Sequence, residues 1–254
     1  MALLKELTAY LDERLRIRDF PGDVSNNGLQ VEGRAEVRKA AFAVDASLEL
    51  FERAAERDAD FIFVHHGLSW GAEPRRLIGA AARRYGELFK RGISLYAAHL
   101  PLDAAPGFGN NAVQADMIGL RELRPFFRYA GAEIGFSGEL ETPETLGALR
   151  SLLESRLGCR AYVSGAEERP CRRIAVVSGG GGLEAVNEAA SLGADLLLTG
   201  ELTHVMYHYA LESDVVVLAL GHYASETTGP RALMELVGSE LDMETEFIDI
   251  PTGL

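Results

Sequence analysis

The sequence has no apolar run long enough to cross a membrane. No stretch approaches the ~18 consecutive apolar residues that a spanning helix requires. The first residues include early acidic side chains and place Leu4, Leu7, Leu11 and Leu15 on one side of a predicted amphipathic helix, which is unlike a signal peptide. We therefore expect neither a membrane span nor a signal peptide, and a cytoplasmic location.

Basic residues and cysteines are also scarce. The chain has 25 Lys and Arg against 38 Asp and Glu, which gives a formal net charge of −13. General nucleic-acid binding is not expected, because it requires a basic footprint, and the acidic balance favours a small-molecule site or cation binding. The two cysteines, Cys159 and Cys171, are interpreted as reduced thiols in a cytosolic protein, with a disulfide as the alternative.

Apolar runs of strand length alternate with helical spacings in both halves of the chain. Residues 39–45, 61–66, 93–98, 173–177, 195–199 and 215–220 are predicted strands, and residues 48–57, 76–90 and 183–192 are predicted helices. This order is typical of a parallel sheet with helical crossovers. Between the halves we expect strands over 124–140, joined at Gly131 and Gly135, and a helix over 144–156.

The second half repeats the plan of the first. Residues 38–64 and 172–198 correspond with a one-residue offset, and Asp60 and Asp195 fall at matched positions. We predict an α/β fold of two related domains, the first over 1–124 with 230–254 returning to it, and the second over 125–229. Chance similarity between generic βαβ segments is the alternative to a true repeat.

Imidazole and carboxylate side chains gather directly after the predicted strands. Such side chains are His65, His66, His99, Asp103, His222 and Glu226. A single histidine at a strand end is usually a structural residue, but the carboxyl ends of parallel strands are where functional groups collect. A catalytic zinc takes about three protein ligands, so six donors favour two ions. The mixed nitrogen and oxygen donors suit Zn, Fe, Mn, Co or Ni without distinguishing among them.

Other polar motifs have weaker interpretations. His204 and His208 share one helix face; His204 suits a surface or capping role, and Glu201 and His208 are candidates for proton transfer. The run 178–182 contains four glycines and is predicted to form a strand-to-helix turn, with phosphate binding as the second interpretation. Asn110 and Asn111 are predicted to cap the following helix.

Several motifs together resemble the NIF-three-like family. They are residues 27–33 (NGLQVEG), 64–67 (VHHG), 99–103 (HLPLD), 109–112 (GNNA), 199–201 (TGE) and 221–226 (GHYASE). Its members are catalogued as GTP cyclohydrolase I type 2 homologues and as dinuclear-metal hexameric proteins, and this chain resembles the short form without an inserted domain. The resemblance implies a toroidal homohexamer and a dinuclear metal site in the cleft between the two domains, with ligands at the six positions given above.

The resulting hypothesis is a metal-dependent hydrolase that acts on a nucleotide-like small molecule. The GTP cyclohydrolase label is provisional, and phosphoester hydrolysis would use the same centre. Arg75, Arg76, Arg83 and Arg84 are the nearest basic groups for a triphosphate, or simply a solvated helix face. The alternative is a non-enzymatic metal-binding scaffold, metal carrier or regulator of other proteins.

Overall fold

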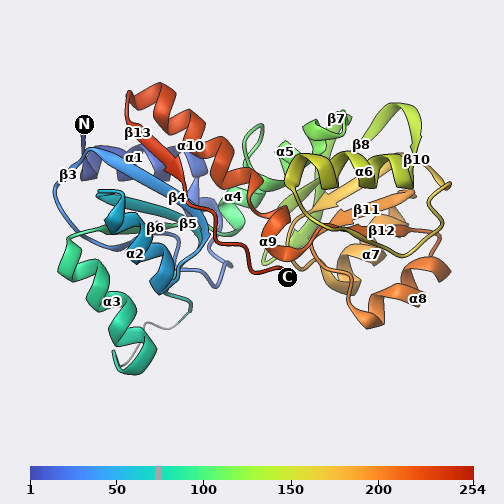
Figure 1. The fold of residues 1–254 in the computed structure, drawn as a ribbon. Coiled ribbons are helices and arrows are strands. Elements are labelled where there is room, and N and C mark those ends of the chain that lie inside the picture. Colours follow the sequence, from blue (N-terminus) through green and yellow to red (C-terminus); the bar gives the residue numbers. More distant parts are fainter. Residues whose placement is uncertain (72–75) are drawn as a thin grey trace. The chain divides into compact units, whose positions relative to one another are not determined.

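The computed structural model describes residues 1–71 and 76–254 and divides into two compact α/β units (Figure 1). Unit 1 contains Met1–Leu102 and Pro230–Ile250, and unit 2 contains Asp103–Gly229 and Pro251–Leu254. The predicted α/β fold is confirmed. Within the described ranges, no helix is both long and apolar enough to cross a membrane.

Unit 1 is built on a five-stranded sheet in the order β13-β4-β5-β6-β2. The strands are β2 (Gly28–Val31), β4 (Lys39–Asp45), β5 (Phe61–His66), β6 (Ser94–Ala97) and β13 (Glu244–Phe247). All neighbours are parallel except β2, which runs antiparallel to β6. A short ladder pairs β1 (Ala2–Leu3) with β3 (Glu36–Val37). The parallel strands are buried on both faces, which explains their nearly continuous apolar sequences.

Helices cover both faces of this sheet (Figure 1). The helices are α1 (Leu4–Leu15), η1 (Ile17–Asp19), α2 (Leu48–Glu56), α3 (Gly79–Arg91) and α4 (Leu100–Ala104), and α10 (Thr228–Leu241) joins them from Pro230 onward. The leucine face predicted for α1 is fully inside the core. On the other side of the sheet, Leu50 and Phe51 of α2 pack with Ile62 and Val64 of β5.

Unit 2 contains a six-stranded sheet in the order β7-β8-β10-β11-β12-β9. The strands are β7 (Arg121–Tyr129), β8 (Ala132–Thr145), β9 (Tyr162–Val163), β10 (Pro170–Val177), β11 (Leu196–Thr199) and β12 (Val216–Ala219). Strands β10, β11 and β12 are parallel, and the others pair antiparallel. Gly131 makes the β7–β8 turn as predicted, but Gly135 lies inside β8, where a Cβ would come within 2.5 Å of the Val176 carbonyl oxygen. The expected turn at Gly135 is therefore wrong.

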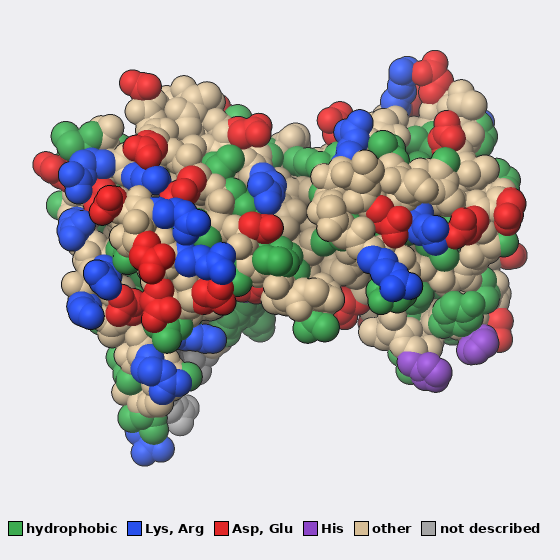
Figure 2. Space-filling model, in the orientation of Figure 1, with side chains coloured by type: hydrophobic (Ala, Val, Ile, Leu, Met, Phe, Trp, Pro, Cys, Tyr) green, Lys and Arg blue, Asp and Glu red, His purple; other side chains and the backbone are tan. Residues whose placement is uncertain are grey.

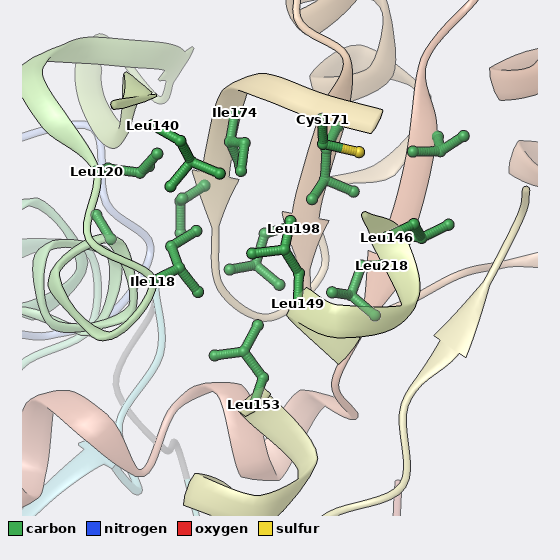
Figure 3. Close-up of a cluster of buried hydrophobic side chains, with 14 of the residues drawn as sticks. Ile118, Leu120, Leu140, Leu146, Leu149, Leu153, Cys171, Ile174, Leu198 and Leu218 are labelled. Atoms are coloured by element: carbon green, nitrogen blue, oxygen red, sulfur yellow. The ribbon is translucent and has the colours of Figure 1, made fainter. Parts of the chain in front are cut away.

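Two helices of unit 2, α5 (Asn110–Met117) and α6 (Leu146–Leu157), contribute to a core on one face of its sheet (Figure 3). The other helices of this unit are α7 (Gly182–Ser191), α8 (His204–Glu212) and α9 (His222–Ser225). Leu149 and Leu153 of α6 pack against Leu198 and Leu218 of the parallel strands. Helix α6 begins two residues later than predicted because β8 continues through Thr145. Both cysteines are free thiols, with Cys171 inside this core.

Matched hydrogen bonds relate the two units. Asp60 accepts a bond at Oδ2 from the Arg38 main-chain N–H, and Asp195 accepts one at Oδ2 from the Arg172 main-chain N–H, both at 2.9 Å. In each unit the main-chain oxygen of the same aspartate then accepts, at 3.0 Å, from the strand that follows. Because these contacts recur at the predicted repeat positions, they support two related domains.

The division between the units lies earlier than the boundary expected at residue 124. Residues 103–124 cluster with unit 2. Their polar side chains explain this assignment: Asn111 donates to the Ile134 carbonyl at 2.8 Å, and Gln114 donates to the Ser225 carbonyl at 2.7 Å. The expected return of the C-terminal segment to unit 1 covers Pro230–Ile250, whereas the last four residues cluster with unit 2.

Candidate metal centre

Three histidines converge at the carboxyl ends of β5 and β6 in unit 1. His65 and His66 end β5, and His99 follows β6. Their ring centroids are 4.5 Å (His65–His66), 5.2 Å (His65–His99) and 5.7 Å (His66–His99) apart. One ligating atom from each lies within 4.8 Å of the others, so the group could hold a metal ion. His65 is completely buried, while His66 and His99 are half-buried.

The Nδ1 atoms of His65 and His66 both face hydrogen-bond acceptors. His65 Nδ1 lies 3.0 Å from the Ala98 carbonyl oxygen, and His66 Nδ1 lies 2.8 Å from Asp45 Oδ1. A carbonyl or carboxylate oxygen only accepts, so each Nδ1 carries a proton, and in the neutral form of each ring the lone pair is on Nε2. Asp45 is positioned by the sheet itself, since it is opposite His66 in the parallel β4–β5 register.

His99 is held by a small polar network before β2. Its Nδ1 donates to Asp23 Oδ1 at 2.9 Å, and its main-chain N–H donates to Asn27 Oδ1 at 2.8 Å. Asp23 Oδ2 accepts from the Asn27 side chain and from the Leu100 N–H. Burial alone would raise the pKa of Asp23, but hydrogen bonds from His99, Asn27 and the Ser25 main chain hold this pKa below its usual value. Asp23 is therefore an ionised partner that fixes the His99 tautomer.

Unit 2 contains a histidine–carboxylate pair after the end of β12. His222 Nε2 lies 3.2 Å from Glu226 Oε1, and His222 Nδ1 lies 2.7 Å from Glu201 Oε1. The hydrogen bond to Glu226 is the main reason that the pKa of His222 rises to about 9; burial lowers it, and the charge of Glu226 and the bond to Glu201 raise it further. His222 and Glu226 are therefore held together by a proton on His222, and this proton would have to leave if the pair bound a metal ion.

Asp103 is a buried carboxylate with two donors on one oxygen. Its Oδ1 accepts from the Asn110 side chain at 2.8 Å and from the Ser178 hydroxyl at 2.9 Å. Asn111 donates to the Asp103 carbonyl and accepts from the Ser178 N–H at 2.6 Å. The two asparagines therefore fix the surroundings of Asp103. Their predicted capping role is wrong, because Gly109 is the N-cap of α5 and no side chain caps it.

The glycine run 178–182 forms the predicted strand-to-helix turn. Two of its amides bond within the protein: the Ser178 N–H donates to Asn111 Oδ1, and the Gly179 N–H donates to Ser225 Oγ at 3.0 Å. At Gly179, with φ +62°, a Cβ would lie 2.3 Å from Glu226 Oε1. The glycine thus lets the backbone pass the Glu226 carboxylate, which explains why Gly179 is needed at this position. Phosphate binding at this turn stays a prediction.

The two remaining histidines lie elsewhere on unit 2. His204 is the first residue of α8 and His208 lies one turn later; both are exposed. Figure 2 shows histidine side chains at the surface in the region of α8. The His208 ring packs edge-on against Tyr207 at 5.3 Å between centroids. Their proton-transfer and surface roles stay predictions. Among the basic candidates, Arg76, Arg83 and Arg84 are exposed, and Arg75 lies outside the described residues.

Sequence reasoning missed Asp23 and Asp45, the carboxylates that orient His99 and His66. Asp45 could have been noticed in the sequence, because it is a charged residue that ends a predicted strand with an apolar interior. The next predicted strand along the chain ends in the two histidines. Asp23 had none, because its partner is 76 residues away. Metal-binding histidines almost always donate the second ring N–H to a carboxylate or carbonyl, so the donors present fit a divalent ion.

Comparisons with known proteins agree with these motifs. The model of the Duf34/NIF3 (NGG1p interacting factor 3) family matches residues 2–253. The chain belongs to this family. A protein of Pyrococcus horikoshii named GTP cyclohydrolase 1 type 2 homolog is 46% identical over 252 residues, 98% of each chain.

Two solved structures also share the fold. The structure of TTHA1606 from Thermus thermophilus has a TM-score of 0.89 at 39% identity and covers 100% of both chains. A structure of the protein ybgI, described as of unknown function, has a TM-score of 0.90 at 35% identity, again with 100% of both chains covered. The predicted family membership is confirmed.

Proposed function

We propose that this chain binds two divalent metal ions and uses them to hydrolyse a nucleotide-like small molecule. The proposed ligands are His65, His66, His99, Asp103, His222 and Glu226. The proposal includes a cytoplasmic homohexamer, supported by the resemblance of the sequence motifs to the NIF-three-like family. The name of the Pyrococcus relative supports a GTP cyclohydrolase type of reaction as the first one to test.

One observation carries the proposal: in all four histidines of the set, a contact of Nδ1 with an oxygen acceptor fixes the orientation of the ring. Each has Nδ1 within 2.7–3.0 Å of an oxygen acceptor. These four acceptors come from different parts of the chain, namely Ala98, Asp45, Asp23 and Glu201. One histidine held in this way can be purely structural. Four rings that are all held at Nδ1, so that Nε2 is the nitrogen that would bind an ion, are what a metal site requires.

The protein side chains would divide the work as follows. When bound, divalent ions supply a hydroxide near neutral pH and polarise the bond under attack. Asp23 and Asp45 hold the protons on His99 and His66 at Nδ1, so that neither ring rotates or changes tautomer. Glu201 holds the Nδ1 proton of His222 and is 44% exposed at its side chain, which allows proton exchange with solvent. Glu201 is therefore the first proposed proton-transfer group, and His208 is the second candidate, from its place in the sequence.

The test is metal content and turnover on the same protein samples. Wild type, His66→Ala, Asp103→Ala and the control His204→Ala would be reconstituted with each candidate metal, and bound metal measured by mass spectrometry. Formate release from GTP and product release from a phosphoester panel would then be assayed. We expect metal-dependent turnover in wild type and the control, with turnover below detection in the two ligand variants.

Two results would overturn the proposal in different ways. Less than one ion per chain in reconstituted wild type would remove the metal site itself. Normal metal binding with no turnover of any tested nucleotide or phosphoester would reject hydrolysis of these substrates and favour a metal-binding scaffold, carrier or regulator.

A further inference from the structure

Trp70, the only tryptophan of the chain, lies beside the three-histidine group of unit 1. Its ring centroid is 5.1 Å from that of His99, with the two planes nearly perpendicular at 70°, and 6.0 Å from that of His66. A large aromatic side chain thus adjoins two of the candidate metal ligands. The proposed hydrolysis assigns it no role.

The position of Trp70 is fixed by hydrogen bonds rather than by burial. The indole Nε1–H donates to the Gly67 carbonyl at 2.9 Å, and the backbone of Trp70 forms an isolated antiparallel bridge with Ser25. The indole N–H is the only polar group of the side chain, and it is engaged within its own loop. The ring therefore offers an apolar surface with no donor of its own to satisfy.

Two residues near β2, Asn26 and Gln30, hold the loop that carries Trp70. Gln30 Oε1 accepts from the Leu68 N–H at 2.7 Å and from the Ser69 N–H at 3.1 Å. Asn26 donates to Ser69 Oγ at 2.6 Å and to the Gly71 carbonyl at 3.3 Å. This loop is thus ordered before any ligand binds, so the ring would lose little conformational freedom on binding.

Despite these restraints, Trp70 remains 37% exposed. A ring that served only to shield the histidines or to fill the core would bury its surface, since burial of an aromatic side chain is a large source of stability. A fixed, partly exposed indole next to candidate metal ligands instead suits a partner that is flat on one side and polar at its edge. Planar nitrogen heterocycles have this combination.

We propose that Trp70 is a stacking platform that selects ligands with a planar heteroaromatic ring, such as a nucleobase. The ring of the ligand would lie against the exposed indole surface, and polar atoms at its edge would reach toward the group of His65, His66 and His99. This inference rests on the proposed function and deepens it, because it names the part of the substrate that the protein recognises.

The experiment uses two ligands that differ only in the base. Guanosine 5′-monophosphate and ribose 5-phosphate would be titrated by calorimetry into metal-reconstituted wild type, Trp70→Leu and Trp70→Phe. Stacking of a base on an aromatic side chain corresponds to about tenfold in affinity or more. We therefore expect wild type to prefer the nucleotide by at least about tenfold, Trp70→Leu to lose that preference, and Trp70→Phe to keep most of it. Ribose 5-phosphate should bind all three proteins equally.

A second readout does not depend on turnover. As the only tryptophan, Trp70 reports on its own surroundings, so its fluorescence should change on addition of the nucleotide and not of ribose 5-phosphate. Bound metal would be measured in every sample. Normal metal content with equal affinity for the two ligands would overturn the stacking proposal alone, whereas failure of wild type to bind metal would overturn the proposed function and the stacking proposal with it.

Discussion

Strand β5 of unit 1 and strand β11 of unit 2 have the same hydrogen-bonded surroundings and different ends. Val64 accepts from the Ala98 N–H at 3.1 Å, and Thr199 accepts from the Leu220 N–H at 2.9 Å. From these matched positions, His65 and His66 of unit 1 correspond to Gly200 and Glu201 of unit 2. The two units therefore share the backbone hydrogen bonds at this point, while the side chains of the next two residues differ.

The side chains at the position of His66 in unit 1 and Glu201 in unit 2 have different roles. His66 presents a ring and is oriented by Asp45, whereas Glu201 orients the ring of His222. In the paired registers Asp45 lies opposite His66, and the position that matches Asp45 in unit 2 is Gly179. Removal of the side chain there leaves room for Glu226, whose Oε1 would be 2.3 Å from an added Cβ. Unit 1 thus contains the three-histidine group, and unit 2 contains a histidine with carboxylates.

The largest effect should come from removing the orienting carboxylate of either unit. We expect Asp45→Ala and Glu201→Ala each to weaken metal binding by about 10–100-fold, because the ring of His66 or His222 loses its fixed tautomer. Calorimetric titration with Zn²⁺ measures this. Asp45→Asn and Glu201→Gln are the matched controls, since both keep an acceptor oxygen and should lose less. Wild-type affinity in both alanine variants would show that the carboxylates do not orient ligands.

The next largest effect is expected on stability, from a substitution of Gly179, the unit 2 residue that matches Asp45. Gly179→Ala places a Cβ against Glu226 and forces a left-handed backbone on alanine, which we expect to cost about 2 kcal/mol. Gly180→Ala is the control: its Cβ would lie 3.4 Å from Glu201 Oε2, an ordinary contact. Chemical denaturation of both variants measures the difference in the free energy of unfolding. Equal stabilities would mean that the close approach to Glu226 is easily relaxed.

The fold was largely predictable from sequence because each unit repeats one local pattern. Apolar strands and amphipathic helices follow from spacing alone, as the buried leucines of α1 illustrate. The errors occurred where tertiary contacts override local signals. Gly135 is a turn residue by type, but it sits within β8 because β10 passes too close for a side chain.

The sequence suggested candidate ligands, which stay predictions, but not the partners that hold their rings. His65, His66, His99 and His222 stand out because each lies at or just after the end of a strand. The acceptors for their Nδ1 atoms come from sequence positions as far as 76 residues away, as with Asp23 and His99. Asn110 and Asn111 were misassigned for the same reason, since the Asn111 partner Ser178 is distant in sequence.

The matched aspartates at the start of each repeat provide a smaller, pH-dependent comparison. The Asp60 side chain is 2% exposed and pairs with Arg34 and Arg38, whereas Asp195 accepts only main-chain bonds among the described residues. We expect Asp60→Asn to cost about 1–2 kcal/mol and Asp195→Asn to cost less. Urea denaturation at pH 7 measures both.

The pH dependence of this difference follows from the pKa of Asp60. Burial would raise this pKa, but the bonds from the Arg38 main chain and from Arg34 and Arg38 lower it below the usual value. A lowered pKa stabilises the fold above the unfolded pKa, and this stabilisation is lost as the pH falls through the folded pKa. The gap between wild type and Asp60→Asn should therefore be full at neutral pH and shrink below about pH 4. A constant gap down to about pH 2 would contradict this assignment.

The smallest effects should come from the histidines of unit 2 that lie on α8. His204→Ala and His208→Ala change exposed side chains, so we expect each to alter the free energy of unfolding by no more than about 0.5 kcal/mol. Metal content should also equal that of wild type, in contrast to His222→Ala. Thermal denaturation and mass spectrometry on the three variants test this contrast. If His208→Ala lowered metal content as His222→Ala does, α8 would have to be counted among the ligand-bearing elements; if it lowered only turnover, the effect would support the proposed proton-transfer role.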